Sequence, residues 1–356
     1  TAAALELLKQ DFSSPASNDF ASVRAAAEAA AYQWAAYNGV PEDDIHDLLV
    51  DDTDCLGPSA FLDTVYLAAE HHTKPLFVSI FKLSVPQIGA PAKACIGSLV
   101  EKSGLLPVAI QVDGVESDCW EDQYTPLFGA ECVLTFGAGD QTSGEAGRVR
   151  LYNDGSFNCS NPNTGGNNQF LEEVENGGAN TTCHVYQGPS CDADPGGCVW
   201  PLTGVGSKPE MDAFNELLSS EGECDSKYGS DANDIDDFLE VVHAIDGDPT
   251  PSPGTTFALN DCWSPRLVDL IIVQQFSAQG NPPLPIWAFA SFYIKGCEVV
   301  DQNGNTQYSA KCDPKDFQGQ IGQTRLRGFF VNLLADEYGA VGPINAWTPK
   351  RVVLVE

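Results

Sequence analysis

The chain has 356 residues and a formal net charge of −32, from 50 acidic and 18 basic side chains. This charge repels nucleic acids and anionic lipid surfaces, so neither class of partner is expected. Hydrophobic residues make up 43% of the chain and aromatic residues 10%, which excludes a largely disordered protein and allows two or three packed units.

Two helices are expected at the start of the chain. Residues 1–10 (TAAALELLKQ) have a helical pattern, and Asp19 or Ser22 can cap a second helix that runs through the alanine-rich stretch RAAAEAAAYQWAAYNGV, Arg24–Val40. The Asn-Gly pair and the proline that follows predict the end of this helix, because glycine adopts the left-handed conformation and proline cannot continue the helix.

Three strands and a short helix are expected next. The strands cover residues 64–69, 88–96 and 104–112, and a short apolar helix begins at Pro75. The strand IGAPAKACI (88–96) alternates so that its alanines share one face. A helix and a strand that both present alanines can approach closely, but each buries little area, so we expect close packing or an assembly partner.

Turns dominate residues 113–260, which are rich in Gly, Asn and Asp. Two helices, at residues 210–220 and 234–245, interrupt them, and residues 246–256 are expected to form an exposed linker. Four strand candidates follow, at residues 268–276, 285–299, 324–336 and 350–356.

The expected fold class is α+β. Alanine-rich N-terminal helices pack on an antiparallel β-sheet in a pilin-like manner, followed by a loop-rich middle with disulfides and a C-terminal antiparallel β set with the helices on one side. The expected domains are an N-terminal helix and strand region, residues 1–102, and a β-rich region, residues 103–356, that carries the insertions at 113–260.

The twelve cysteines predict disulfides formed outside the cytoplasm, because their number is even and no Cys-x-x-Cys motif is present. They are Cys55, Cys95, Cys119, Cys132, Cys159, Cys183, Cys191, Cys198, Cys224, Cys262, Cys297 and Cys312. Local spacing favours three pairs, while the full connectivity stays open. These are Cys297 with Cys312, Cys119 with Cys132, and Cys191 with Cys198.

The acidic composition favours a soluble, solvated surface or a salt-rich habitat, and the alternative is calcium bound in loops or between subunits. Oxygen-bearing side chains at alternating positions suit Ca²⁺. The clusters are Asp231, Asn233 and Asp234, and Asp246 with Asp248. Neither fits an EF-hand loop, since Ile235 stands where a ligand is required.

Asn158 and Asn180 each begin an Asn-x-Ser/Thr sequence and are candidate glycosylation sites.

No catalytic motif points to an enzyme. A Gly-x-Ser-x-Gly elbow, a phosphate-binding glycine loop and a His-Glu-x-x-His motif are all absent from the sequence. The adjacent His71 and His72 point to opposite faces of a strand and make poor joint ligands. We therefore expect a non-enzymatic protein, with a secreted hydrolase as the weakest alternative.

Several segments, taken in order, resemble the TadE/TadG-like proteins of the Tad (tight adherence, Flp) pilus-assembly family. They are TAAALELLKQ, the alanine-rich helix, IGAPAKACI, SGLLPVAIQV, GEAGRVRL, FLEEVENGG, the strands between residues 264 and 334, and the final VVLVE. The resemblance is spread over most of the chain, and no single motif is diagnostic. It implies a membrane-spanning helix upstream of the alanine-rich segment, which the sequence lacks.

The expected function is that of an extracellular or cell-surface structural protein. It would be a subunit of, or accessory to, a pilus-like or tubular filament, forming a homo-polymer through residues 1–20 or the terminal strand at 350–356. The alternative is an adhesin or glycan-binding protein that uses Trp120, Tyr124 and Trp200.

Overall fold

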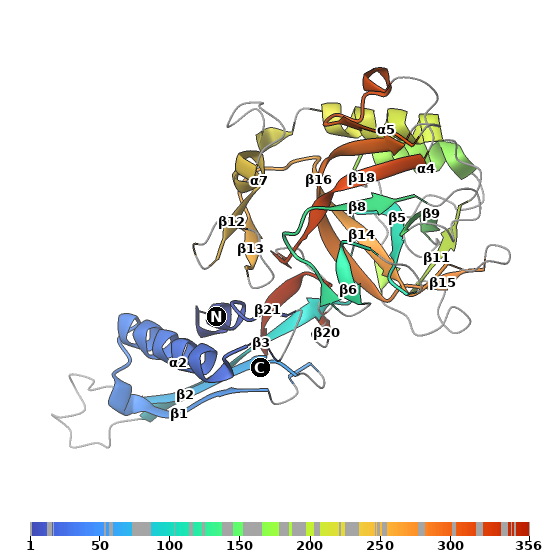
Figure 1. Ribbon diagram of the computed structural model, residues 1–356. Coiled ribbons are helices and arrows are strands. Elements are labelled where there is room, and N and C mark those ends of the chain that lie inside the picture. Colours follow the sequence, from blue (N-terminus) through green and yellow to red (C-terminus); the bar gives the residue numbers. More distant parts are fainter. Residues whose placement is uncertain are drawn as a thin grey trace, which may run out of the picture. The chain divides into compact units, whose positions relative to one another are not determined.

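The chain forms two compact units in the computed structural model (Figure 1). Unit 1 comprises residues 1–98, 341–344 and 350–356, and unit 2 comprises residues 99–340 and 345–349. The structure describes residues 2–12, 16, 18–52, 55–56, 60–72, 87–102, 104–113, 117–122, 125–136, 145–151, 166–177, 185–186, 197–202, 207–220, 222–224, 235–245, 247, 250, 255–276, 282–300, 304–317, 323–335, 341–342, 344 and 347–355. The α+β class is confirmed by helices and sheets in both units.

Unit 1 consists of two helices and an antiparallel sheet with the strand order β1-β2-β3-β21. Its elements are α1 (Ala2–Leu7), α2 (Phe20–Tyr37), a 3₁₀ turn (Glu42–Asp44), β1 (Ile45–Asp51), β2 (Thr64–His72), β3 (Gln87–Leu99), β20 (Val341–Gly342) and β21 (Lys350–Val355). The short strand β20 pairs with β3. The expected helix from Pro75 lies outside the described residues.

Helix α2 begins and ends where the sequence predicts. The Asp19 carboxylate accepts a hydrogen bond from the backbone N–H of Ser22, which caps the N-terminus. At the C-terminus, Asn38 donates a side-chain hydrogen bond to the Trp34 carbonyl at 2.7 Å, and Gly39 adopts φ +79°. Glycine enters this left-handed conformation without the steric cost that a Cβ imposes.

The segment around α1 is buried inside unit 1. Its apolar side chains are almost completely covered: Ala3, Ala4, Leu7, Leu8 and Phe12. The side chain of Gln10 exchanges two hydrogen bonds with the backbone of Leu62, at 2.8 and 3.0 Å, and so ties this segment to the chain just before β2. These residues therefore contribute to the core of unit 1.

The position of the last strand, β21, in the sequence predicts that it joins the other C-terminal strands. The structure differs from this prediction. Strand β21 pairs antiparallel with β3, with Val353 opposite Cys95, and so belongs to unit 1. Unit 1 thus combines residues 1–98 with this strand from the end of the sequence. The apolar, β-branched pattern predicted a strand correctly, but such a pattern does not specify which sheet edge the strand joins.

Unit 2 is built on a nine-stranded sheet with the order β15-β11-β9-β5-β14-β16-β18-β8, to which β17 adds beside β16. Its strands are β5 (Leu105–Gln111), β8 (Cys132–Thr135), β9 (Ala146–Leu151), β11 (Cys198–Pro201), β14 (Leu267–Val273), β15 (Leu284–Pro285), β16 (Ala288–Val300), β17 (Thr306–Ser309) and β18 (Gln323–Val331). The sheet is mixed and not purely antiparallel, because β5 and β14 run parallel.

Smaller elements surround this sheet. The helices are α4 (Gly166–Glu175), α5 (Ser207–Ser219), α7 (Ile235–Val241) and a 3₁₀ turn (Pro314–Asp316). The short strands are β4 (Glu101–Lys102), β6 (Trp120–Asp122), β7 (Thr125–Pro126), β10 (Val185–Tyr186), β12 (Val242–Ala244), β13 (Phe257–Leu259) and β19 (Leu333–Leu334). The expected helix at 234–245 was too long, since its last residues form β12, which pairs with β13.

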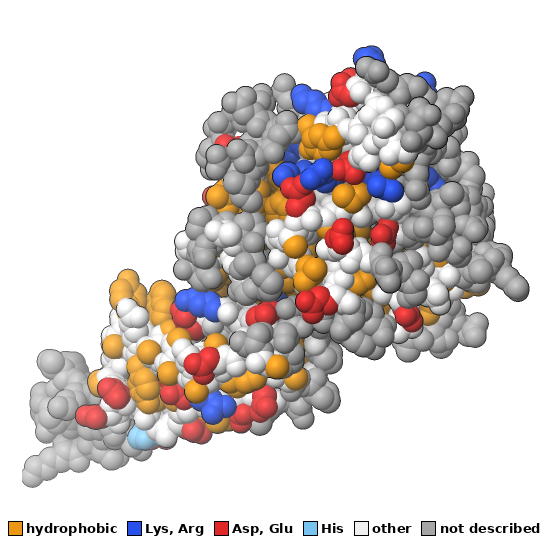
Figure 2. Space-filling model, in the orientation of Figure 1, with side chains coloured by type: hydrophobic (Ala, Val, Ile, Leu, Met, Phe, Trp, Pro, Cys, Tyr) orange, Lys and Arg blue, Asp and Glu red, His pale blue; other side chains and the backbone are white. Residues whose placement is uncertain are grey.

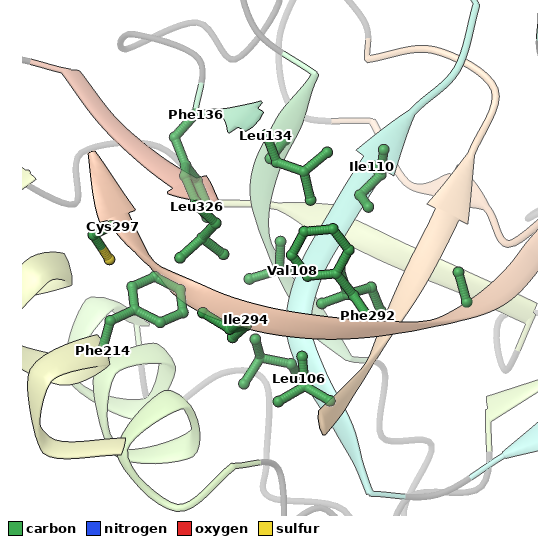
Figure 3. Packing of buried hydrophobic residues seen from close by; sticks show 14 of the residues in the cluster. Leu106, Val108, Ile110, Leu134, Phe136, Phe214, Phe292, Ile294, Cys297 and Leu326 are labelled. Atoms are coloured by element: carbon green, nitrogen blue, oxygen red, sulfur yellow. The ribbon is translucent and has the colours of Figure 1, made fainter. Parts of the chain in front are cut away.

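Both faces of the sheet are buried. One face packs against α4 and α5, and Phe214 of α5 lies beside Ile294 of β16 in this cluster (Figure 3). On the opposite face of β16, Tyr293 packs against Phe238 of α7 with ring centroids 5.2 Å apart. Alternate residues of one strand therefore serve two different apolar layers.

A buried ion pair joins the sheet to helix α5. The Nε and Nη2 atoms of Arg148 in β9 lie 2.7 and 2.8 Å from the two carboxylate oxygens of Glu210. The Arg148 guanidinium also lies over the ring of Phe136, 5.6 Å from its centroid. Burial raises the pKa of Glu210, and the opposite charge of Arg148 counteracts that rise.

We expect Glu210→Leu to destabilise unit 2 by about 3–5 kcal/mol, because it leaves the Arg148 charge buried without its carboxylate. The double variant Arg148→Met/Glu210→Leu removes both charges and should recover at least half of that loss. Urea unfolding of the three proteins measures this. A double variant as unstable as Glu210→Leu alone would contradict the charge-based explanation.

Lys350 makes unit 1 sensitive to pH. Its side chain is fully buried, its ammonium nitrogen lies 5.0 Å from the centroid of the Phe12 ring, and burial lowers its pKa from 10.5 to about 7. At pH values between about 7 and 10.5, Lys350 is therefore protonated in the unfolded chain and neutral in the folded unit. Raising the pH from about 7 towards 10.5 should stabilise unit 1, by up to about 1.4 kcal/mol per pH unit.

Lys350→Met should abolish this pH dependence, because it removes the titrating group. Hydrogen exchange of the β3 and β21 amides, compared between the two proteins at equal pH, measures the difference without interference from intrinsic exchange rates. Equal protection of both proteins from pH 7 to 9 would refute the proposed burial cost.

Candidate functional site

A shallow apolar groove runs between α2 and the sheet of unit 1. Its volume is about 220 Å³, and alanines line it from three elements: Ala3 of α1, Ala31 and Ala35 of α2, and Ala92 and Ala94 of β3. The alanine faces of the helix and strand thus point towards each other, as the sequence predicts. The two faces do not fill the space between them, and the groove is the part that stays open.

Large hydrophobic side chains stand exposed around this groove. Trp34, 52% exposed, and Leu354, 70% exposed, both line it, and Tyr37 beside them is 82% exposed. The rings of Trp34 and Tyr37 meet edge to face at 5.6 Å. Hydrophobic side chains gather over α2 in the space-filling view (Figure 2).

We refer to Trp34, Tyr37, Leu354 and the alanine groove as the α2 face. Among the described residues that line the groove, Lys93 alone carries a charge. In α2, the described buried residues are Ala27 and Ala31, so the helix contacts unit 1 through small side chains, while the rings of Trp34 and Tyr37 face solvent. Contiguous exposed apolar surface of this kind marks interaction sites in soluble proteins.

The disulfides predicted from local spacing are partly confirmed. The structure pairs Cys119 with Cys132 and Cys297 with Cys312, and adds two pairs that the spacing did not single out, Cys55–Cys95 and Cys224–Cys262. Cys198 is also disulfide-bonded, but Cys159, Cys183 and Cys191 lie outside the described residues. Four disulfides among the described residues indicate an oxidising environment.

The expected calcium and glycosylation residues lie in parts of the chain that the structure does not describe. This holds for Asp231, Asn233, Asp234, Asp246 and Asp248, and for Asn158 and Asn180. Among the described residues, no group of three or more His, Cys, Asp or Glu side chains is arranged to hold a metal ion.

The aromatic residues expected in a glycan-binding site are not displayed together. Trp120 is buried, and its ring packs against Trp347 with centroids 5.8 Å apart, so it belongs to the core of unit 2. Trp200 is half-buried in β11, and Tyr124 lies outside the described residues. Among the described residues, the tryptophans with large exposed surfaces are Trp34 in unit 1, at 52%, and Trp263 in unit 2, at 49%, and neither belongs to the expected set.

Polar groups on the sheet of unit 2 form an ion-pair network. Glu131 receives hydrogen bonds from Lys295 and Arg327, and Arg327 also binds Glu298 at 2.7 Å. Burial raises the pKa of Glu131, but the hydrogen bonds from the two cations outweigh burial and hold the pKa below its ordinary value. These groups neutralise one another, as expected of a structural network.

Comparison with family models, with curated proteins and with solved structures gave no match to this chain. In the described part of the chain, no helix is both long and apolar enough to span a bilayer.

Proposed function

We propose that this protein is a non-enzymatic, extracellular structural protein whose copies assemble into a pilus-like filament, and that the α2 face is one of its assembly surfaces. The observation that carries the proposal is the combination of exposed Trp34, Tyr37 and Leu354 with an apolar groove on the same face. A helix lying on an antiparallel sheet also agrees with the pilin-like arrangement that the resemblance to TadE/TadG-like proteins implies.

Burial of this face by another copy of the chain would remove its large apolar side chains from water. Aromatic rings and aliphatic side chains dominate binding energy when a partner removes them from water. The shallow alanine groove admits a neighbouring helix or side chain at short distance, and the nearly uncharged lining imposes little desolvation cost. Within the groove lining, the charge that such a contact meets is that of Lys93.

A filament also requires a second, different surface, because a face that pairs only with itself closes a dimer. Strand β1 (Ile45–Asp51) offers such a surface, since it ends the strand order of the unit 1 sheet. Its outer backbone groups can pair with an added strand, as in β-augmentation. Asp47 and Asp51 on this strand would limit pairing to a complementary partner.

The test is electron microscopy and sedimentation of the native protein, the double variant Trp34→Ala/Leu354→Ala and the matched control Trp263→Ala. The control removes a tryptophan of similar exposure, 49% against 52%, from unit 2. We expect filaments from the native protein and the control. The double variant should need at least about ten times the concentration to assemble, since each anchor contributes over about 1 kcal/mol.

Two results would contradict the proposal. Native protein that stays monomeric at all concentrations would refute the filament function. Filaments of the double variant that form at the native concentration would show that assembly uses a different surface.

A further inference from the structure

A second hollow lies in unit 2, remote in sequence from the α2 face. Its volume is about 480 Å³, the largest of the three hollows considered among the described residues. Trp263, Asn260 and Asp261 line it from the turn after β13, and Lys102 of β4 and Asp269 of β14 line its polar floor. This volume falls in the range of small-molecule sites.

The floor of this hollow carries one charge of each sign. The ammonium of Lys102, whose side chain is 4% exposed, lies 3.0 Å from the carboxylate of Asp269. Asp269 also accepts a hydrogen bond from the Ser291 hydroxyl at 2.6 Å. Asp269 keeps 20% of its side chain exposed, so a ligand in the hollow can reach a carboxylate that the protein has already fixed in place.

The turn that carries Trp263 is held rigidly from several sides. The Asn260 side chain donates hydrogen bonds to the carbonyls of Leu239 and Glu240, and its oxygen lies 2.8 Å from the ring nitrogen of His243. The backbone N–H of Cys224 donates to the Trp263 carbonyl, and the Cys224–Cys262 disulfide fixes the adjacent residue.

A tryptophan that served the core would be buried, as Trp120 and Trp347 are at 4% and 2% exposure, but Trp263 on this rigid turn is 49% exposed. A fixed turn removes part of the entropy cost of binding, so the exposed ring is ready to receive a ligand.

The charges select the class of ligand. An anion would be repelled by the rim carboxylates Glu223 and Asp261 and by the net charge of the whole chain. A cation would be attracted by the rim, but it finds no unpaired carboxylate at the floor, because Asp269 already binds Lys102. Hydroxyl groups both donate and accept hydrogen bonds, so they can bind beside the Lys102–Asp269 pair without adding charge.

We propose that this hollow binds a neutral saccharide, with one face of a sugar ring packed on Trp263 and its hydroxyls directed to the Lys102–Asp269 pair. The C–H groups on a pyranose face supply the apolar contact that a flat indole ring accepts. The site differs from the aromatic set expected from sequence, because it uses Trp263 in place of the buried Trp120. It is independent of the proposed filament function.

The test is isothermal titration calorimetry with cellotetraose, maltotetraose, mannotetraose and xylotetraose as neutral probes. Tetragalacturonate and chitosan tetraose serve as anionic and cationic probes of the same length. We expect at least one neutral probe to bind and both charged probes to bind at least tenfold more weakly. Absence of binding by every neutral probe at 10 mM (about the weakest affinity that calorimetry resolves), or preference for a charged probe, would overturn the proposal.

Variants locate the site. Trp263→Ala should weaken binding at least tenfold, Trp263→Phe should restore part of it, and Asp269→Asn should weaken binding while nearly preserving side-chain shape. Trp34→Ala/Leu354→Ala is the matched control and should bind like the native protein. Unchanged binding by Trp263→Ala would overturn the proposal, and loss of binding by the Trp34/Leu354 double variant would do the same.

Discussion

Unit 2 depends on one constraint: the central strand β16 is buried on both faces, so both faces must be covered. Phe292 and Ile294 on one side need an apolar layer, which α4 and α5 supply. Phe289 and Tyr293 on the other side need a second layer, which comes from neighbouring strand residues and from α7. Helices α4, α5 and α7, which supply these covers, all come from the middle of the chain, and the Cys119–Cys132 disulfide joins one of its segments to β8.

The same constraint explains where polar groups occur. A helix that covers an apolar sheet can be attached to it by a buried polar contact only if the charges are matched, and Arg148 and Glu210 meet this condition with two parallel hydrogen bonds. In unit 1 the helix contacts the sheet without a buried ion pair among the described residues, because α2 packs on it through alanines. Little area is buried there, and the large side chains of the helix remain available to a partner.

Local features could be predicted from the sequence because they depend on neighbouring residues. The Asp19 cap, the stop at Asn38–Gly39 and the strands expected at residues 64–69, 88–96 and 104–112 are of this kind. Residues 113–260, expected to be mostly turns, instead contain strands β8, β9 and β11 and helix α4. The helix expected at 234–245 was too long because Val241 and Val242 fit either a helix or a strand. Pairing with β13 places Val242 in a strand. The partner of β21, the burial of Trp120 and the exposure of Trp263 depend on contacts between distant segments, which periodicity does not encode.

The pairing of β21 with β3 has a consequence for synthesis on the ribosome. Residues 99–340 must all be translated before the strand that completes the unit 1 sheet exists. Until then, the β3 edge is left open, and closing such a long loop carries an entropic cost that slows pairing. The α2 face is therefore incomplete until Leu354, close to the end of the sequence, has been made.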